Sequence, residues 1–261
     1  MMKMLIGFFH RCLLIILLLF LWWLWGLQAE PANLAPRLDS VIASAYELIV
    51  EDKLWLALLI SLGRILRGFA IALLLGLAIG TLMAVNKHIE RNLNPVFQSV
   101  RHIAPVSIVP LAILWLGSGT PAAIFVIAFA SFFPMLLNVI SGIKTINAIY
   151  IRAALSMGLG KWNLFRTVMV PAALPSILNG ARVAIGVAWT SVIASELAVS
   201  AKSGSGSSGG IGQMMFTFFA YEVRPDKLVV CMLGIGLVAL GIDLIFRRVQ
   251  QRWTAWATRV S

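Results

Sequence analysis

The sequence predicts an all-α integral membrane protein with about six transmembrane helices. Hydrophobic residues make up 60% of the 261 residues and charged residues only 12%. A soluble domain typically carries about 25% charged residues. The mean hydropathy of +0.93 agrees with a membrane location. The composition argues against a disordered chain, a collagen and a disulfide scaffold.

Six apolar stretches are expected to cross the membrane, because each approaches the roughly 20 residues that an upright helix needs. Their ranges are 12–27, 57–85, 104–116, 121–143, 172–200 and 228–246. The first resembles a signal peptide, but Leu27 stands where a cleavage site needs a small residue, so we expect an uncleaved span. The third is short and contains Pro105 and Pro110. It is either a marginal span or is extended by the preceding polar loop.

The polar segments suggest three parts. Residues 1–56 would hold the first span and an external linker, with an amphipathic helix within residues 36–50. Residues 57–246 would form the transmembrane core, and residues 247–261 a basic cytoplasmic tail. Between the last two spans, the Gly/Ser run at residues 203–210 is typical of a flexible loop.

The distribution of basic residues predicts the orientation. With both termini inside and six crossings, thirteen Lys and Arg residues fall in cytoplasmic segments and five in external ones. Cytoplasmic loops carry the excess of Lys and Arg, so this orientation is favoured.

Arg64, Arg67, Arg182 and Glu196 are charged residues well inside the expected spans, and Asp243 lies near the end of the last one. Such charges usually face the protein interior or water, because exposure to lipid is costly. Arg64 and Arg67 are three residues apart and are expected to share a helix face. The four residues could line an anion path, or Glu196 could pair with Arg64 or Arg182 as part of the scaffold.

Other short-range patterns indicate packing. Gly76 and Gly80 form a small-xxx-small pair, and Gly234, Gly236 and Gly241 recur in the last span. Such glycines let helices approach closely, within one subunit or between two. Asp243 and Arg247 are four residues apart and are expected to form an ion pair. A metal site is not expected, because neither the cysteines nor the histidines have metal-ligand spacing.

The segment 144–180 is expected to be cytoplasmic, yet it has helical periodicity. Apolar or small residues recur at i, i+3, i+4 and i+7, namely at Tyr150, Ala153, Ala154 and Met157. Gly158 and Gly160 permit a sharp turn. A second short apolar helix follows from Trp162, and Pro171 and Pro175 are expected to separate it from the next span. This helix–turn–helix is suited to docking.

The run from Arg152 to Gly158, followed by Val170 to Pro175, resembles the EAA loop of bacterial ABC-importer permeases. The stretch from about 55 to 245 is similar to the nitrate/sulfonate/taurine/bicarbonate branch of that family. The similar runs are Ser61–Arg64, Gly68–Phe69, Asn94–Pro95, Pro105–Pro110, Ile113–Gly117, Phe133–Pro134 with Asn138, and Gly210–Gly212.

This resemblance implies a type I ABC importer permease fold in the bacterial inner membrane. It implies a second permease copy, two cytoplasmic ATPase subunits that bind ATP and Mg, and an extracytoplasmic substrate-binding protein. The solute would be a small anion such as nitrate, bicarbonate or a sulfonate. In the family the first short helix of the loop enters a cleft on the ATPase, which assigns ATPase coupling to Arg152, Ala153, Ala154, Met157 and Gly158. The family usually has Glu at the position of Arg152, so the charge there is reversed.

Enzymatic functions are not indicated. The sequence has no glycine-rich phosphate loop with Lys-Ser/Thr, so we expect no ATPase activity in this subunit and no catalytic residues or cofactor of its own. The main alternative is a secondary transporter of a small anion, which would show inverted repeats, and no convincing repeat is present. A structural anchor would leave the 144–175 loop and the intramembrane charges unexplained.

Overall fold

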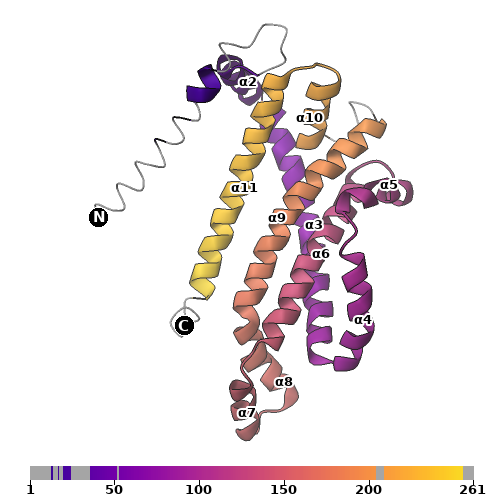
Figure 1. Cartoon of the computed structure of the whole chain (residues 1–261), viewed down its shortest axis with the longest axis vertical. Helices are drawn as coiled ribbons and strands as arrows, with labels where there is room; N and C mark the ends of the chain where they lie inside the picture. Colours follow the sequence, from indigo (N-terminus) through magenta and orange to yellow (C-terminus); the bar gives the residue numbers. More distant parts are fainter. Residues whose placement is uncertain are drawn as a thin grey trace.

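A computed structural model of the chain describes residues 13, 17, 20–24, 36–51, 53–203 and 209–254. Within these residues all regular secondary structure is helical. Four long helices run along the molecule, with α2 and α10 at one end and α7 and α8 at the other (Figure 1). The elements are α2 (Leu38–Val50), α3 (Lys53–Val85), α4 (Lys87–Val100), α5 (Pro105–Leu116), α6 (Thr120–Lys144), α7 (Ala148–Ser156), α8 (Lys161–Leu164), the π-helix η1 (Phe165–Met169), α9 (Val170–Ser203), α10 (Ile211–Ala220) and α11 (Pro225–Trp253).

The expected spans agree with the long helices of the described residues. Four continuous helical stretches are long and apolar enough to cross a membrane: Lys53–Val85, Thr120–Lys144, Lys161–Ala201 and Pro225–Trp253. Among the residues that the structure describes, a fifth crossing is present only if α4 and α5, which are bent by 96° at their junction, count as one broken span. Most of the expected first span, residues 12–27, lies outside the described residues.

Two expectations about local structure are wrong. The polar segment 86–103, expected to be a loop, is largely the helix α4, which the Asn86 side chain caps by accepting from the His88 and Ile89 backbone amides at 2.9 and 3.3 Å. Hydropathy alone cannot reveal a polar helix. Pro171 and Pro175 do not separate the loop from the next span, because the helix continues through both. The five-residue π-turn η1 precedes Pro171 and accommodates a ring that clashes with an ordinary α-helical turn.

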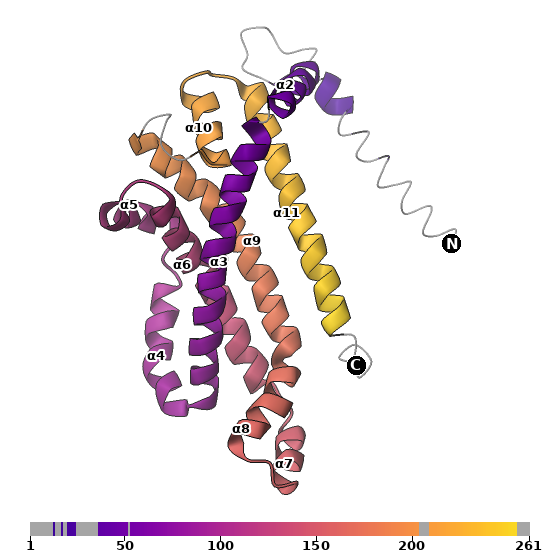
Figure 2. The ribbon, with the colours of Figure 1, turned by 180° about the vertical axis from the view of Figure 1, so that it is seen from behind.

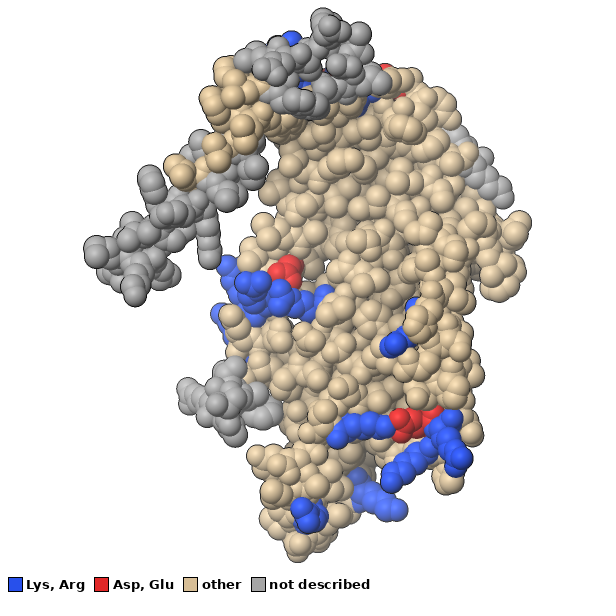
Figure 3. Space-filling model, in the orientation of Figure 1, with Lys and Arg blue, Asp and Glu red and all other residues tan. Residues whose placement is uncertain are grey.

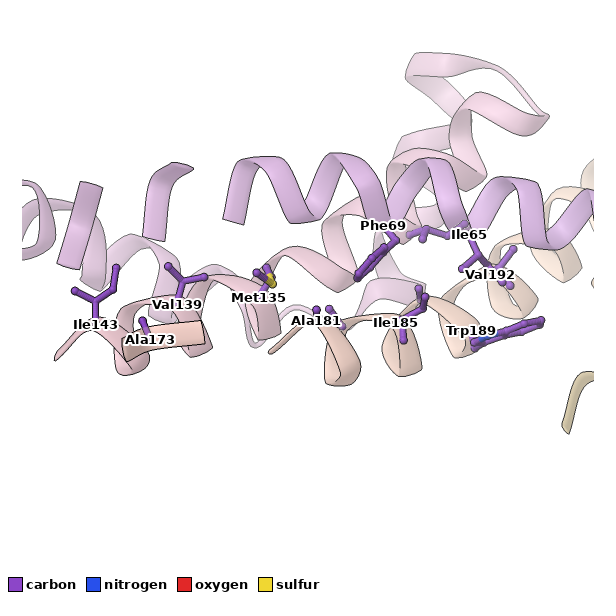
Figure 4. Close-up of a cluster of buried hydrophobic side chains, with 13 residues drawn as sticks. Ile65, Phe69, Met135, Val139, Ile143, Ala173, Ala181, Ile185, Trp189 and Val192 are labelled. Atoms are coloured by element: carbon purple, nitrogen blue, oxygen red, sulfur yellow. The ribbon is translucent and has the colours of Figure 1, made fainter. Parts of the chain in front are cut away.

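The central core is the layer where α3, α6 and α9 meet, and its side chains interdigitate along the bundle (Figure 4). Gly76 and Gly80 belong to this layer. A Cβ atom would lie 2.7 Å from Met135 Cγ at Gly76 and 2.9 Å from Val139 Cβ at Gly80. These glycines therefore pack inside the subunit.

The glycines of α11 differ from those of α3. A Cβ atom at Gly236 or Gly241 would meet nothing within 4 Å. The pattern of the last span therefore does not mark close packing among the described residues. A second cluster of buried side chains, contributed by α2, α3, α10 and α11, closes the end of the bundle opposite α7.

Candidate functional site

Arg64 and Glu196 form a buried ion pair between α3 and α9. Arg64 Nη1 lies 2.5 Å from Glu196 Oε1, and the side chains are only 2% and 1% exposed. The Ser61 hydroxyl donates to the same carboxylate at 2.8 Å. On its other side, the Arg64 guanidinium donates to Thr120 Oγ1 at 3.1 and 3.2 Å. The expected Arg–Glu196 contact is thus confirmed, with Arg64 and not Arg182 as the partner.

The same carboxylate holds the start of α10. The Gly212 amide donates to Glu196 Oε2 at 2.8 Å, and the Ile211 amide donates to Ser61 Oγ at 2.9 Å. A Cβ atom at Gly210 would lie 2.2 Å from Glu196 Oε1, so a side chain there requires a shift. The cluster therefore ties α3, α6, α9 and α10 together. Ser61 and Thr120 were not identified from sequence, although Ser61 lies on the face of Arg64, one turn away.

Arg182 forms a different pair, with Asp243 of α11. Its Nε and Nη2 atoms donate to the two carboxylate oxygens at 2.6 and 2.9 Å. Arg247 lies 3.6 Å from the same carboxylate, as its spacing predicts. The side chains of Arg182 and Asp243 are 32% and 36% exposed, so this pair is only partly enclosed.

Arg67 is exposed on the subunit, and its Nε donates to the Gly63 carbonyl of its own helix at 3.0 Å. In the subunit Arg67 therefore does not share the buried environment of Arg64, although the two residues are three apart on α3. The boundary between the buried and exposed faces of α3 falls between these two residues.

The loop expected to couple to an ATPase projects from the end of the bundle as α7 and α8 (Figures 1 and 2). Arg152, Ala153 and Met157 are exposed on it. Ala154 is 2% exposed, so its side chain packs within the subunit and is not on the surface of α7. The expected apolar face is therefore divided between an outward and an inward part.

Gly158 forms the turn after α7 with φ +79°, a left-handed conformation that favours glycine. The Gly158 and Leu159 amides donate back to the Leu155 and Ala154 carbonyls, closing the helix end. The predicted helix break at Gly158 is confirmed.

Basic side chains gather near this end of the molecule. On the face shown in Figure 3, most visible Lys and Arg residues lie beside the C-terminal end of α11, over the start of α4, and near α7 and α8. Among the described residues, no group of His, Cys, Asp or Glu could hold a metal ion.

Comparison with known proteins identifies the family. Residues 68–255 match the model of the binding-protein-dependent transport system inner membrane component. The chain belongs to this family. It is a membrane-spanning permease subunit of an ABC importer, and its family implies ATPase and substrate-binding protein partners. A secondary transporter finds no support in these comparisons.

Several permeases of other organisms are similar to this chain. A putative ABC transporter permease of Methanocaldococcus jannaschii is 34% identical, over 76% of this chain and 72% of the relative. The taurine transport system permease of Escherichia coli is 30% identical, over 79% and 72%. The bicarbonate transport system permease of Synechocystis is 35% identical over 71% of this chain, which spans 64% of that relative.

Solved structures share the fold. An amino acid ABC transporter matches 80% of this chain and 95% of its own with a TM-score of 0.60 at 17% identity. The inward-facing MetNI methionine ABC transporter matches 78% and 95% with a TM-score of 0.58 at 20% identity. The expected type I importer permease fold is therefore confirmed.

Proposed function

We propose that this permease pairs with a second copy to form the translocation path for a small anion. An extracytoplasmic binding protein would deliver the anion, and two cytoplasmic ATPase subunits would drive transport with ATP and Mg. The named relatives that carry bicarbonate and taurine support the anion. The permease itself would contribute the path and no catalysis.

The proposed orientation places α7, α8 and the C-terminal end of α11 in the cytoplasm of a bacterium. The basic side chains near this end support it, because cytoplasmic segments carry the excess of Lys and Arg. The N-terminus would lie on the same side. Membrane-impermeant thiol labelling of intact cells should reach a cysteine placed at residue 206 and not one at residue 150.

The exposure of helix α7 at the end of the bundle is the observation that supports docking to an ATPase. This helix offers the exposed side chains of Tyr150 and Met157, 57% and 73% exposed, at the end of the bundle. Ala153 is exposed between them and is small enough to let a partner surface approach. Ala154 would act indirectly, by holding α7 against the subunit.

Bulk at Ala153 tests this docking. Ala153→Trp should overfill the ATPase cleft, since overpacking costs typically about 1–3 kcal/mol. Gly158→Val should strain the turn, because the φ there is positive. Both should abolish ATP-driven uptake and reduce the amount of co-purified ATPase, while membrane insertion is retained. Leu155→Trp adds the same bulk about 200° around α7 and serves as the matched control. Normal transport by both test variants would remove the coupling assignment.

Arg152 reports the charge of the partner surface. If Arg152 meets an acidic patch, Arg152→Glu should weaken ATPase binding, and the loss should shrink as salt screens the repulsion. If no ion pair exists, this change to the usual family residue should be harmless. Co-purification at low and high salt separates the two cases.

The substrate class is tested with the whole importer in membrane vesicles supplied with ATP and its binding protein. Labelled bicarbonate, nitrate and taurine are the probes. ATP-dependent uptake of at least one anion is expected. A complex that hydrolyses ATP yet accumulates none of them would contradict an anion importer of this class.

A further inference from the structure

The helix α4 is polar and borders the transmembrane bundle. None of its residues is buried in the subunit. It rises beside α3 and turns into α5 near the middle of the long axis (Figures 1 and 2). Its 14 residues span about 21 Å, compared with about 30 Å for the hydrocarbon core of a bilayer. α4 begins directly after α3, whose C-terminal end lies at the cytoplasmic membrane surface in the proposed orientation. With that starting point the junction lies at membrane depth, so Arg101, one of the thirteen basic residues counted as cytoplasmic, lies within the membrane region instead.

The junction exposes irregular backbone at this depth. Residues 101–104 connect two helices bent by 96°, and all four are exposed on the subunit. Exposed non-helical backbone is not tolerated in lipid, so it must be covered by protein or line a water-filled path. The face of the subunit that carries α4 and this junction is thus the one directed at the path.

A cavity of about 430 Å³ opens at the junction. Arg101 and His102 supply its charge-bearing side chains, and α6 supplies an apolar wall that includes Phe129 and Phe133. The volume falls within the range of small-molecule pockets, roughly 300–1,000 Å³. The cavity therefore combines room for a small solute with an arginine and few other polar groups.

Arg101 differs from the other arginines of the membrane region. Arg64 and Arg182 are paired with carboxylates, and Arg67 donates to a carbonyl of its own helix. The Arg101 guanidinium has no hydrogen-bond or ion-pair partner among the described residues. A cation at membrane depth favours an anion or water as its neighbour.

His102 offers a second polar group at the cavity. Its Nδ1 lies 2.6 Å from the Gln98 carbonyl oxygen, which can only accept, so Nδ1 carries the proton of this contact. This leaves Nε2 as the ring nitrogen that can meet a ligand. The groove between α9 and α11 also holds an arginine, but Asp243 already neutralises Arg182 there.

We propose that Arg101, assisted by His102, binds the transported anion in the cavity at the α4–α5 junction, as a selectivity point within the translocation path. This inference rests on the proposed import of a small anion. The ligand chemistry is a small oxyanion, a carboxylate or a sulfonate, which the planar guanidinium contacts with two parallel N–H groups.

Uptake by vesicles that carry the whole importer provides the first test. Arg101→Gln should lower the initial rate for labelled bicarbonate, nitrate or taurine by at least about tenfold, because a charge-assisted contact is lost. Arg101→Lys should recover part of the rate. The matched control Arg91→Gln removes an exposed α4 arginine two to three turns earlier and should stay within about twofold of the wild type. If Arg101→Gln transports the anion at the same rate as Arg91→Gln and the wild type, the inference is overturned while anion import stays intact.

Charge-selective labelling provides a second test that needs no known substrate. In a Cys12→Ser/Cys231→Ser background, Ile103→Cys places a thiol on the cavity wall. A negatively charged methanethiosulfonate should modify it faster than a positively charged one, and Arg101→Gln should abolish that preference. Absence of the preference with Arg101 present would overturn the anion site. Presence of the preference in an importer that transports none of the three anions would keep the site and reject the proposed substrates.

Discussion

Arg64 with Glu196 and Arg182 with Asp243 are both arginine–carboxylate pairs between long helices, yet their surroundings differ. The first pair is almost fully buried and shares its carboxylate with Ser61 and a backbone amide of α10. Within the part of the chain that the structure describes, the second has Arg247 as its one further partner, and it is about one third exposed. Enclosure and shared partners make the first pair a fixed joint of the fold. The second is free to rearrange without leaving buried polar groups unsatisfied.

The largest effect is expected from Glu196→Gln. It leaves the Arg64 charge buried without its carboxylate, and breaking a buried pair from one side costs about 3–5 kcal/mol. Assembly yield and the thermal stability of the purified permease should fall more than its preference among substrates. The double variant Arg64→Met/Glu196→Gln should be more stable than Glu196→Gln alone. If Glu196→Gln has the same melting temperature as the wild type, the pair is not a fixed joint of the fold. If it instead changes the preference among substrates, the pair belongs to an anion path.

A smaller loss of stability is expected when the Glu196 carboxylate is kept and a side chain is added beside it. Gly210→Ala brings a methyl group against Glu196 Oε1, at a cost of about 1–3 kcal/mol for overpacking. Gly236→Ala is the matched control, since its new methyl group meets no neighbour. It should be neutral or stabilising by up to about 1 kcal/mol, as expected for alanine in a helix. The melting temperature of Gly210→Ala should be lower than that of Gly236→Ala. Equal values would contradict close packing at Gly210.

Asp243→Asn should have a weak effect. A partly exposed pair is worth at most about 1 kcal/mol, and Arg182 can reach water when its partner is lost. The thermal stability should change little compared with Glu196→Gln. A loss as large as that of Glu196→Gln would show that exposure on the isolated subunit does not describe this pair in the assembled importer.

A third pair, at the end of the bundle opposite α7, gives the smallest expected effect. Lys227 Nζ donates to Glu47 Oε1 at 2.8 Å, which holds the pKa of the Glu47 carboxyl below its usual 4.5. A lowered folded-state pKa adds stability that is complete above pH 4.5 and is lost as the pH falls through the folded-state value. Glu47→Gln should therefore flatten the acid side of the stability profile and leave the slope above pH 6 unchanged. An unchanged profile below pH 4.5 would contradict this contribution.

The sequence predicted the apolar spans, the charged residues within α3 and α9 and the helix break at Gly158, because each depends on local composition or spacing. It missed the helix α4, since hydropathy does not distinguish a polar helix from a polar loop. It also placed Ala154 on the docking face. The periodicity of α7 marks one apolar face but does not show how that face divides between the subunit and the surface.

The amino-acid sequence by itself therefore determined that this protein crosses the membrane as helices, which segment forms the helix–turn–helix between the apolar spans 121–143 and 172–200, and that Arg64, Arg182 and Glu196 lie within apolar helices. Only the tertiary structure decided that Glu196 pairs with Arg64, 132 residues away, that Asp243 pairs with Arg182, and that Arg101 borders a cavity. The physical reason is that a helix forms through contacts within four residues. The partner of a side chain depends instead on how packed helices are rotated and offset, which the close contacts of Gly76 and Gly80 with α6 help to fix.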